Sequence, residues 1–157
     1  MPNNQNLIRI IKRLVYSAAL PLCLLGAPLT LQAAPAIVAS DAGIEIVDDN
    51  EISQPGYLVL DNTSDKELIL VRARASAFGL IMIHQAAIDH GVVRMLLKQD
   101  LVLPAGKKTV LDAKGVHLMF AGRKVRQKAG EKTTVTLVFN DGSQLPVEFE
   151  WRKPSRR

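Results

Sequence analysis

The sequence predicts an all-β fold, an antiparallel β-sandwich or barrel built as a single domain. From Ala42 onward apolar and polar residues alternate with a period of two, and turn residues recur at short intervals. Nothing in this part of the chain shows the pattern of a long helix. The 157 residues leave room for one domain, and an apolar content of 48% is compatible with a packed core.

Nine strands are predicted, each bounded by turn or polar residues. In chain order they are Ile44 to Val47, Gly56 to Leu60, Glu67 to Ala73, Leu80 to Ala86, Val92 to Leu97, Lys107 to Leu111, Val116 to Phe120, Thr133 to Phe139 and Gln144 to Trp151. The last two strands flank Asn140-Asp141-Gly142, which predicts a tight hairpin. In the final strand the apolar residues fall at every second position from Leu145 to Trp151, so they share one face.

The net charge of +5 is concentrated at the two ends of the chain. Seven basic residues lie there, and without them the middle carries a charge of −2: Arg9, Lys12, Arg13, Arg152, Lys153, Arg156 and Arg157. Between the two ends no basic patch is interleaved with stacking aromatic residues. The composition therefore argues against binding to nucleic acid.

The N-terminal residues predict an export signal. A basic segment precedes the apolar stretch Leu14 to Leu31, and small residues follow, so we expect cleavage after Ala33. The expected organisation is a signal peptide over residues 1–33, a β-sandwich domain over 34–152 and a disordered basic tail over 153–157. The expected location is the bacterial periplasm. An uncleaved membrane anchor and lipid attachment at Cys23 are the alternatives, although the bulky Leu22 disfavours the lipid.

Cys23 is the only cysteine, and it lies inside the segment expected to be removed. The mature chain would then contain neither a thiol nor a disulfide, so packing of apolar side chains must stabilise it. A blue-copper electron carrier needs a cysteine thiolate as a metal ligand. That class of copper protein is therefore excluded for the mature chain.

Four residues form a candidate metal site: His84, Met95, His117 and Met119. Thioether sulfur is a soft, uncharged donor that hard cations do not favour, so two imidazoles with two thioethers indicate Cu(I). In the strand Val116 to Phe120, alternation places His117 and Met119 side by side on one face, with the apolar residues on the other.

The other two donors belong to a predicted hairpin whose turn is Asp89-His90-Gly91. Ile81 and Ile83 fit the core, so Met82 and His84 occupy the opposite face of the first strand, and Met95 comes from the second. All four donors converge if this hairpin packs beside Val116 to Phe120. A simpler interpretation exists for single residues: Met82 and Met95 as core fillers and His90 as a satisfied surface or core histidine.

The spacing His84-x10-Met95-x21-His117-x-Met119 resembles the H(M)x10Mx21HxM signature of the periplasmic PCuAC copper chaperone family. The resemblance extends over most of the expected mature chain, through these segments: Gly56-Tyr57, Asn62, Gly91 to Met95, Leu103 to Gly106, Gly115 to Met119 and Gly130. It implies a cupredoxin-like β-sandwich that binds Cu(I) through the two histidines and two methionines. Met82 matches the optional methionine of the signature and is an auxiliary candidate.

The resemblance also implies a partner, a copper-accepting protein. This would be the CuA subunit of cytochrome c oxidase or another periplasmic copper chaperone. Some family members carry a His- and Met-rich C-terminal extension, whereas this chain ends in Arg152 to Arg157 without such donors. A second copper site is therefore not expected.

The sequence thus predicts a periplasmic Cu(I) metallochaperone that transfers its metal without chemical turnover. The alternative is an exported, metal-free β-sandwich adaptor in which the same residues pack or contact a protein. An enzyme is not expected, because the chain shows no Ser/His/Asp order, no paired carboxylates at a recognisable spacing and no glycine loop for phosphate. No small-molecule substrate is expected either.

Overall fold

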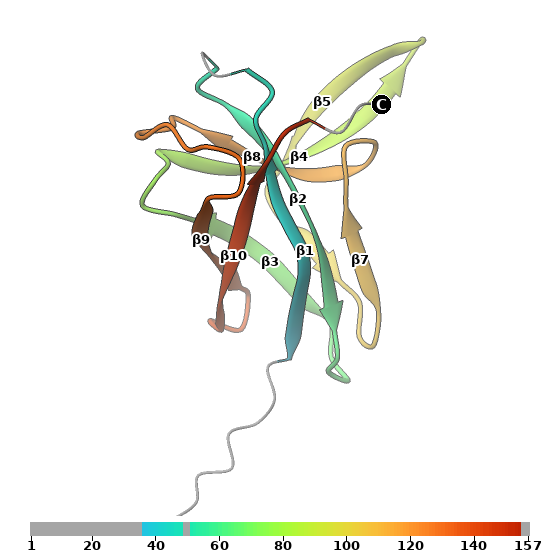
Figure 1. Ribbon diagram of the computed structural model, residues 1–157. Helices are drawn as coiled ribbons and strands as arrows, with labels where there is room; N and C mark the ends of the chain where they lie inside the picture. Colours follow the sequence, from blue (N-terminus) through green and yellow to red (C-terminus); the bar gives the residue numbers. More distant parts are fainter. Residues whose placement is uncertain (1–35, 49–50, 155–157) are drawn as a thin grey trace, which may run out of the picture. The chain divides into compact units, whose positions relative to one another are not determined.

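Ten β-strands make up the computed structural model of the protein, which describes residues 36–48 and 51–154 (Figure 1). They are β1 (Ile37–Glu45), β2 (Gln54–Asn62), β3 (Leu68–Arg74), β4 (Leu80–Asp89), β5 (Val92–Lys98), β6 (Leu101–Leu103), β7 (Lys108–Leu111), β8 (Val116–Ala121), β9 (Lys132–Phe139) and β10 (Gln144–Arg152). The described residues include no helix, and hence none that could cross a membrane. The all-β prediction is confirmed.

The predicted strands are all present, with two differences. The three-residue strand β6 was not predicted, because so short a segment shows no clear period. The first strand was predicted at Ile44 to Val47 but runs from Ile37 to Glu45. Between Ser40 and Gly43 its register with β2 shifts, and Asp41 has a φ of 53°, so this bulge hides the alternation of its first half.

The predicted export signal, with Cys23 and the cleavage point at Ala33, lies outside the described residues. The described strands all belong to one compact unit. Of the predicted tail, Lys153 and Pro154 are described; they follow β10 and are exposed.

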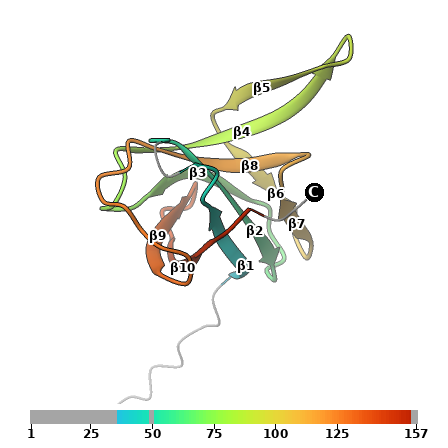
Figure 2. The same ribbon diagram turned by 45° about the horizontal axis from the view of Figure 1, so that its top comes forward.

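The strands are hydrogen-bonded in the order β5-β4-β8-β2-β1-β10-β9-β3-β6, and β7 also pairs with β2. One edge of β2 is shared, since residues 54–56 pair with β8 and residues 58–61 pair with β7. The buried apolar residues of these strands form one core, and in Figure 2 β4 and β8 cross above β1, β9 and β10. The pairing of β1 with β10 is parallel, an exception to the predicted antiparallel arrangement.

Aromatic rings hold the centre of the core. The ring of Phe78 stacks on Trp151 at a centroid distance of 5.8 Å and tilts against Phe120 at 5.0 Å. Phe120 also meets Phe149 edge-on at 5.5 Å. The predicted alternation of the last strand is confirmed, because Val147, Phe149 and Trp151 are all buried. These contacts tie the final hairpin to β8, the strand that carries two of the candidate donors.

The hairpin between β9 and β10 has the predicted turn. Phe139 and Ser143 close it through a backbone hydrogen bond of 3.0 Å, and Gly142 takes a φ of 83°, which favours glycine. A carboxylate oxygen of Asp141 accepts hydrogen bonds from the Ser143 hydroxyl and backbone N–H. These bonds lower the pKa of Asp141 below its usual range, because they stabilise the ionised form.

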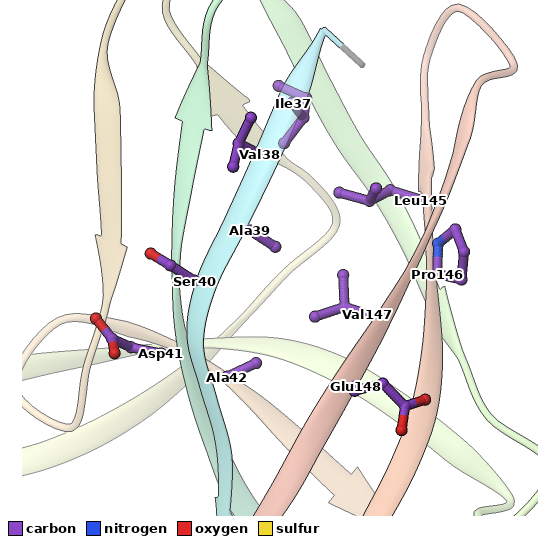
Figure 3. A pocket seen from close by; sticks show the side chains of 10 residues that line it. All are labelled: Ile37, Val38, Ala39, Ser40, Asp41, Ala42, Leu145, Pro146, Val147 and Glu148. Carbon is purple, nitrogen blue, oxygen red and sulfur yellow. The ribbon is translucent and has the colours of Figure 1, made fainter. Parts of the chain in front are cut away.

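The strands β1 and β10 pair only through Gly43–Glu45 and Glu150–Arg152. Before those residues they lie apart and enclose a groove of about 420 Å³, with small and apolar side chains from both strands facing it (Figure 3). The candidate donors lie elsewhere, on β4, β5 and β8.

Replacing Gly56 with alanine tests how closely β2 and β8 pack. A Cβ atom at this position would lie 2.3 Å from Cε2 of the buried Phe120 ring, which would have to move. We expect the free energy of unfolding to fall by about 1–3 kcal/mol, measured by urea denaturation. The control is Gly79→Ala, whose new Cβ would come no closer than 3.7 Å to its neighbours and should change stability by less than about 0.5 kcal/mol. Unchanged stability in Gly56→Ala would contradict this account of the packing.

Candidate metal centre

The candidate donors are positioned by the pairing of β4 with β8. His84 lies directly opposite His117, and Met82 lies directly opposite Met119. The two imidazole rings meet edge-on, with centroids 5.9 Å apart and an interplanar angle of 74°. Directly opposed residues share a face of the sheet, so two imidazoles and two thioethers form adjacent rows.

The opposite face of the same two strands belongs to the core. Ile81, Ile83, Leu118 and Phe120 are all buried, with exposed fractions of 8% or less. Because side chains alternate along a strand, this burial directs the donors to the outer face. The predicted sides of both strands are therefore confirmed.

Met95 reaches the same face from β5. Its partner across the hairpin is Ala86, two residues beyond His84, and its side chain is 52% exposed. A pocket of about 410 Å³ brings Met95 together with His117 and Met119. The rest of the lining consists of Val47, Glu51, Ser53, Pro55, Tyr57 and Ala113. His84 is not part of this lining; it lies beside the pocket, against the His117 ring.

His117 is buried although it lies on the outer face of its strands, with an exposed fraction of 2%. The Tyr57 ring packs against it edge-on at a centroid distance of 6.2 Å. The turn before β8 is fixed by Asp112, whose carboxylate accepts hydrogen bonds from the backbone N–H groups of Lys114 and Gly115. This turn supplies Ala113 to the pocket.

The His84 ring has an unmet hydrogen-bonding capacity. Its Nδ1 atom is buried and has no hydrogen-bond partner among the described residues. A buried polar atom without a partner is costly, and a bound metal ion or a rotation of the ring would relieve that cost. Within residues 36–48 and 51–154 no three His, Cys, Asp or Glu side chains come together as metal ligands. The donors that lie beside the two imidazoles are the methionine sulfurs, which suit a soft ion.

His90 stands apart from the donors at the tip of the β4–β5 hairpin. Its Nδ1 atom lies 2.6 Å from the Asp89 carboxylate, and its side chain is 96% exposed. Its φ of 49° fits its place in the turn with Gly91. Of the two simple interpretations, a surface or a core histidine, the structure shows the surface one.

The sequence did not single out Gln54, which supports one wall of the pocket. Gln54 is fully buried, and its side chain accepts a hydrogen bond from the Val47 N–H at 2.8 Å. Its amide donates to the carbonyl oxygens of Asp48 at 2.9 Å and Glu51 at 3.1 Å. Val47 and Glu51 both line the pocket, so Gln54 fixes the segment that carries them. Its position in the alternation of β2 could have revealed it, because Gln54 is a polar residue on the same face as Leu58 and Leu60.

Residues 36–151 match the model of the family described as "Putative lipoprotein LpqE-like". The chain belongs to the LpqE-like family. The match spans every described strand except the last residue of β10.

Two curated proteins resemble this LpqE-like chain. One is "Putative lipoprotein Lxx21020" of Leifsonia xyli subsp. xyli, 37% identical over 87 residues, which cover 55% of this chain and 52% of that protein. The other is "Uncharacterized protein RP573" of Rickettsia prowazekii, 34% identical over 95 residues, which cover 60% and 52%. The chain spans about half the length of the curated relatives it matches.

Solved PCuAC domains share the fold of this LpqE-like domain. The copper-bound PCuAC domain of PmoF2 superposes with a TM-score of 0.66 at 15% identity, over 78% of this chain and 97% of that domain. The solution structures of apo-DR1885 and CuI-DR1885 from Deinococcus radiodurans superpose with TM-scores of 0.60 and 0.59, both at 27% identity. They cover 78% of this chain and 83% and 81% of theirs. The predicted cupredoxin-like sandwich is confirmed.

Replacing Gln54 with alanine should loosen the wall of the pocket that carries Val47 and Glu51. The substitution removes three part-buried hydrogen bonds, leaves one N–H and two carbonyl groups to find other partners, and empties the space of a fully buried side chain. We expect a loss of about 1–3 kcal/mol in the free energy of unfolding and faster amide hydrogen exchange at Val47. Gln144→Ala is the control, because its side chain is exposed and bonds only Arg74 among the described contacts. If the amide of Val47 exchanges at the parental rate in Gln54→Ala, this role of Gln54 is refuted.

Proposed function

We propose that this protein is an exported Cu(I) metallochaperone that binds the metal through His84, Met95, His117 and Met119. The observation that carries the proposal is the direct opposition of His84 and His117 on the outer face of β4 and β8, with thioethers beside them. The likeness to DR1885, solved in apo and CuI forms, supports the same metal. Met82, opposite Met119, is the auxiliary donor.

The chemistry of the donors suits transport of the ion better than permanent retention. Imidazole nitrogen and thioether sulfur are uncharged, so the bound Cu(I) keeps its positive charge. A recipient with thiolate ligands offers a soft anionic donor that this site lacks. We therefore propose that copper moves to a copper-accepting protein, either the CuA subunit of cytochrome c oxidase or another periplasmic copper chaperone.

The proposed site of action is the periplasm, reached through a signal peptide over residues 1–33 that is cleaved near Ala33. The basic segment and apolar stretch of the N-terminal sequence support export. The relative named as a lipoprotein in Leifsonia supports export as well. Lipid attachment at Cys23 is the alternative to cleavage at Ala33.

A metal-free adaptor is the second candidate function. The observation that favours it is the exposure of apolar side chains on β5, where Val92, Val93, Leu96 and Leu97 are all more than half exposed. An exposed apolar strand suits contact with another protein whether or not a metal is bound. Metal binding separates the two candidates.

Anaerobic Cu(I) titration of the mature chain tests the proposed donors. We expect one Cu(I) per chain, with affinity lowered at least about tenfold, or about 1.4 kcal/mol, in Met95→Leu and in His117→Ala. His90→Ala is the control and should bind as the parent does, because its ring lies at the hairpin tip. The site would be rejected and the adaptor favoured if the parent does not bind Cu(I), or if both donor variants bind it with the parental affinity. Met82→Leu measures the auxiliary contribution.

Delivery is tested by mixing the Cu(I)-loaded protein with a purified apo CuA domain and following the copper in each protein after separation. We expect copper to accumulate on the CuA domain, because its thiolates bind Cu(I) more strongly than thioethers do. The control is Cu(I) bound to a small chelator, supplied at the same total copper concentration. Transfer no faster than from the chelator would argue against direct delivery to CuA.

A further inference from the structure

The β4–β5 hairpin has two faces of different character. Its pairing is regular along its length, from Ile83 opposite Lys98 to Asp89 opposite Val92. One face, here called the ligand face, carries the candidate donors and holds no charged side chain. It consists of Met82, His84, Ala86, Ile88, Val93, Met95 and Leu97. The other face carries Asp89, Arg94 and Lys98 along the same strands.

The outer half of the ligand face is open to solvent. Ile88 is 80% exposed, Leu97 67% and Val93 60%, and these side chains surround Met95. Because β5 is the end strand of the sheet, no described strand covers its far edge. In both ribbon views the hairpin extends away from the other strands (Figures 1 and 2). A contiguous exposed apolar surface of this kind marks a place where another molecule binds.

We propose that the ligand face is the docking surface for the protein that receives the copper. This inference rests on the proposed function. Met95 is the most exposed of the four donors that the proposal assigns, whereas His117 is 2% exposed. A recipient can reach a bound ion from the Met95 side, and to do so it must cover Ile88, Val93 and Leu97.

The exchange itself needs no oxidant or reductant. A thiolate of the recipient forms a bond to Cu(I) as the bond from the Met95 sulfur breaks, and the remaining donors follow in turn. Copper stays Cu(I), and the thiol proton goes to solvent when the thiolate forms. Covering the face removes water from around the ion and strengthens the bond between Cu(I) and the incoming anionic sulfur.

The uncharged ligand face defines the chemistry of the recipient. A partner with charged side chains next to its copper ligands would lose their hydration without gaining an ion pair here. The recipient should therefore surround its thiolates with apolar surface, as the ligand face surrounds Met95. Charged residues of the recipient would fit only beyond the patch, toward Asp89, Arg94 and Lys98.

Neighbouring valines on opposite faces provide a matched test. Val93 is 60% exposed on the ligand face, and Val92 is 59% exposed on the other face. Cu(I)-loaded Val93→Asn, Ile88→Asn and Val92→Asn are each mixed with an apo CuA domain and, separately, with a small Cu(I) chelator. The Cu(I) affinity and the thermal unfolding of each variant are measured first. Size-exclusion chromatography over a range of concentrations measures self-association.

We expect Val93→Asn and Ile88→Asn to slow transfer to the CuA domain at least tenfold, while Val92→Asn transfers at the parental rate. Loss of copper to the chelator, which needs no docking, should be the same in all variants. Equal transfer rates to the CuA domain in every variant would overturn the docking surface, as would a parent that transfers no faster to that domain than to the chelator. A parental dimer that Val93→Asn dissociates would assign the face to a second copy and also overturn it. Failure of the parent to bind Cu(I) would instead reject the proposed function.

Discussion

The register between β4 and β8 is the constraint on which the rest of the site depends. Ile81 and Ile83 pack into the core beside Leu118 and Phe120, and that packing fixes which residues of the two strands lie opposite each other. A slip of one residue would bury His117 and Met119 in the core and expose two large apolar side chains. The core therefore sets the distance between the two imidazoles. The site needs no separate scaffold.

Two buried side-chain amides, one at each end of β2, hold the loops that adjoin this strand. The inner face of β2 begins with Gln54 and ends with Asn62, and both are fully buried. Asn62 donates to the carbonyl oxygens of Lys66 and Leu103, while Gln54 binds the segment that walls the pocket. Each amide makes hydrogen bonds with backbone groups of a loop that have no partner in a β-ladder. One strand thus closes the core at one end and shapes the candidate site at the other.

Alternation explains what could be predicted from the sequence. It placed His117 and Met119 on one face, and Met82 and His84 on one face, because the members of each pair lie two positions apart on a single strand. The opposition of His84 and His117 is a contact between distant segments that local periodicity cannot fix. The sequence could give it only as a condition, that the hairpin packs beside Val116 to Phe120. The bulge at Asp41 was missed because it breaks the period, and β6 because it is too short to show one. The role of Gln54 was missed because a polar residue occupies a position of the apolar face.

The parallel contact between β1 and β10 has a consequence for when the fold can form. These are the first and last strands, so the seam between them closes only after the whole domain is available. Contacts between such distant segments carry a large loop-closure cost and form late. A chain that crosses a membrane before it folds would benefit from this order, because the pairing of β1 with β10 cannot form until the last strand is available. The strands that carry the candidate donors, β4, β5 and β8, all precede β10 in the chain, so they are available for pairing before this seam can close.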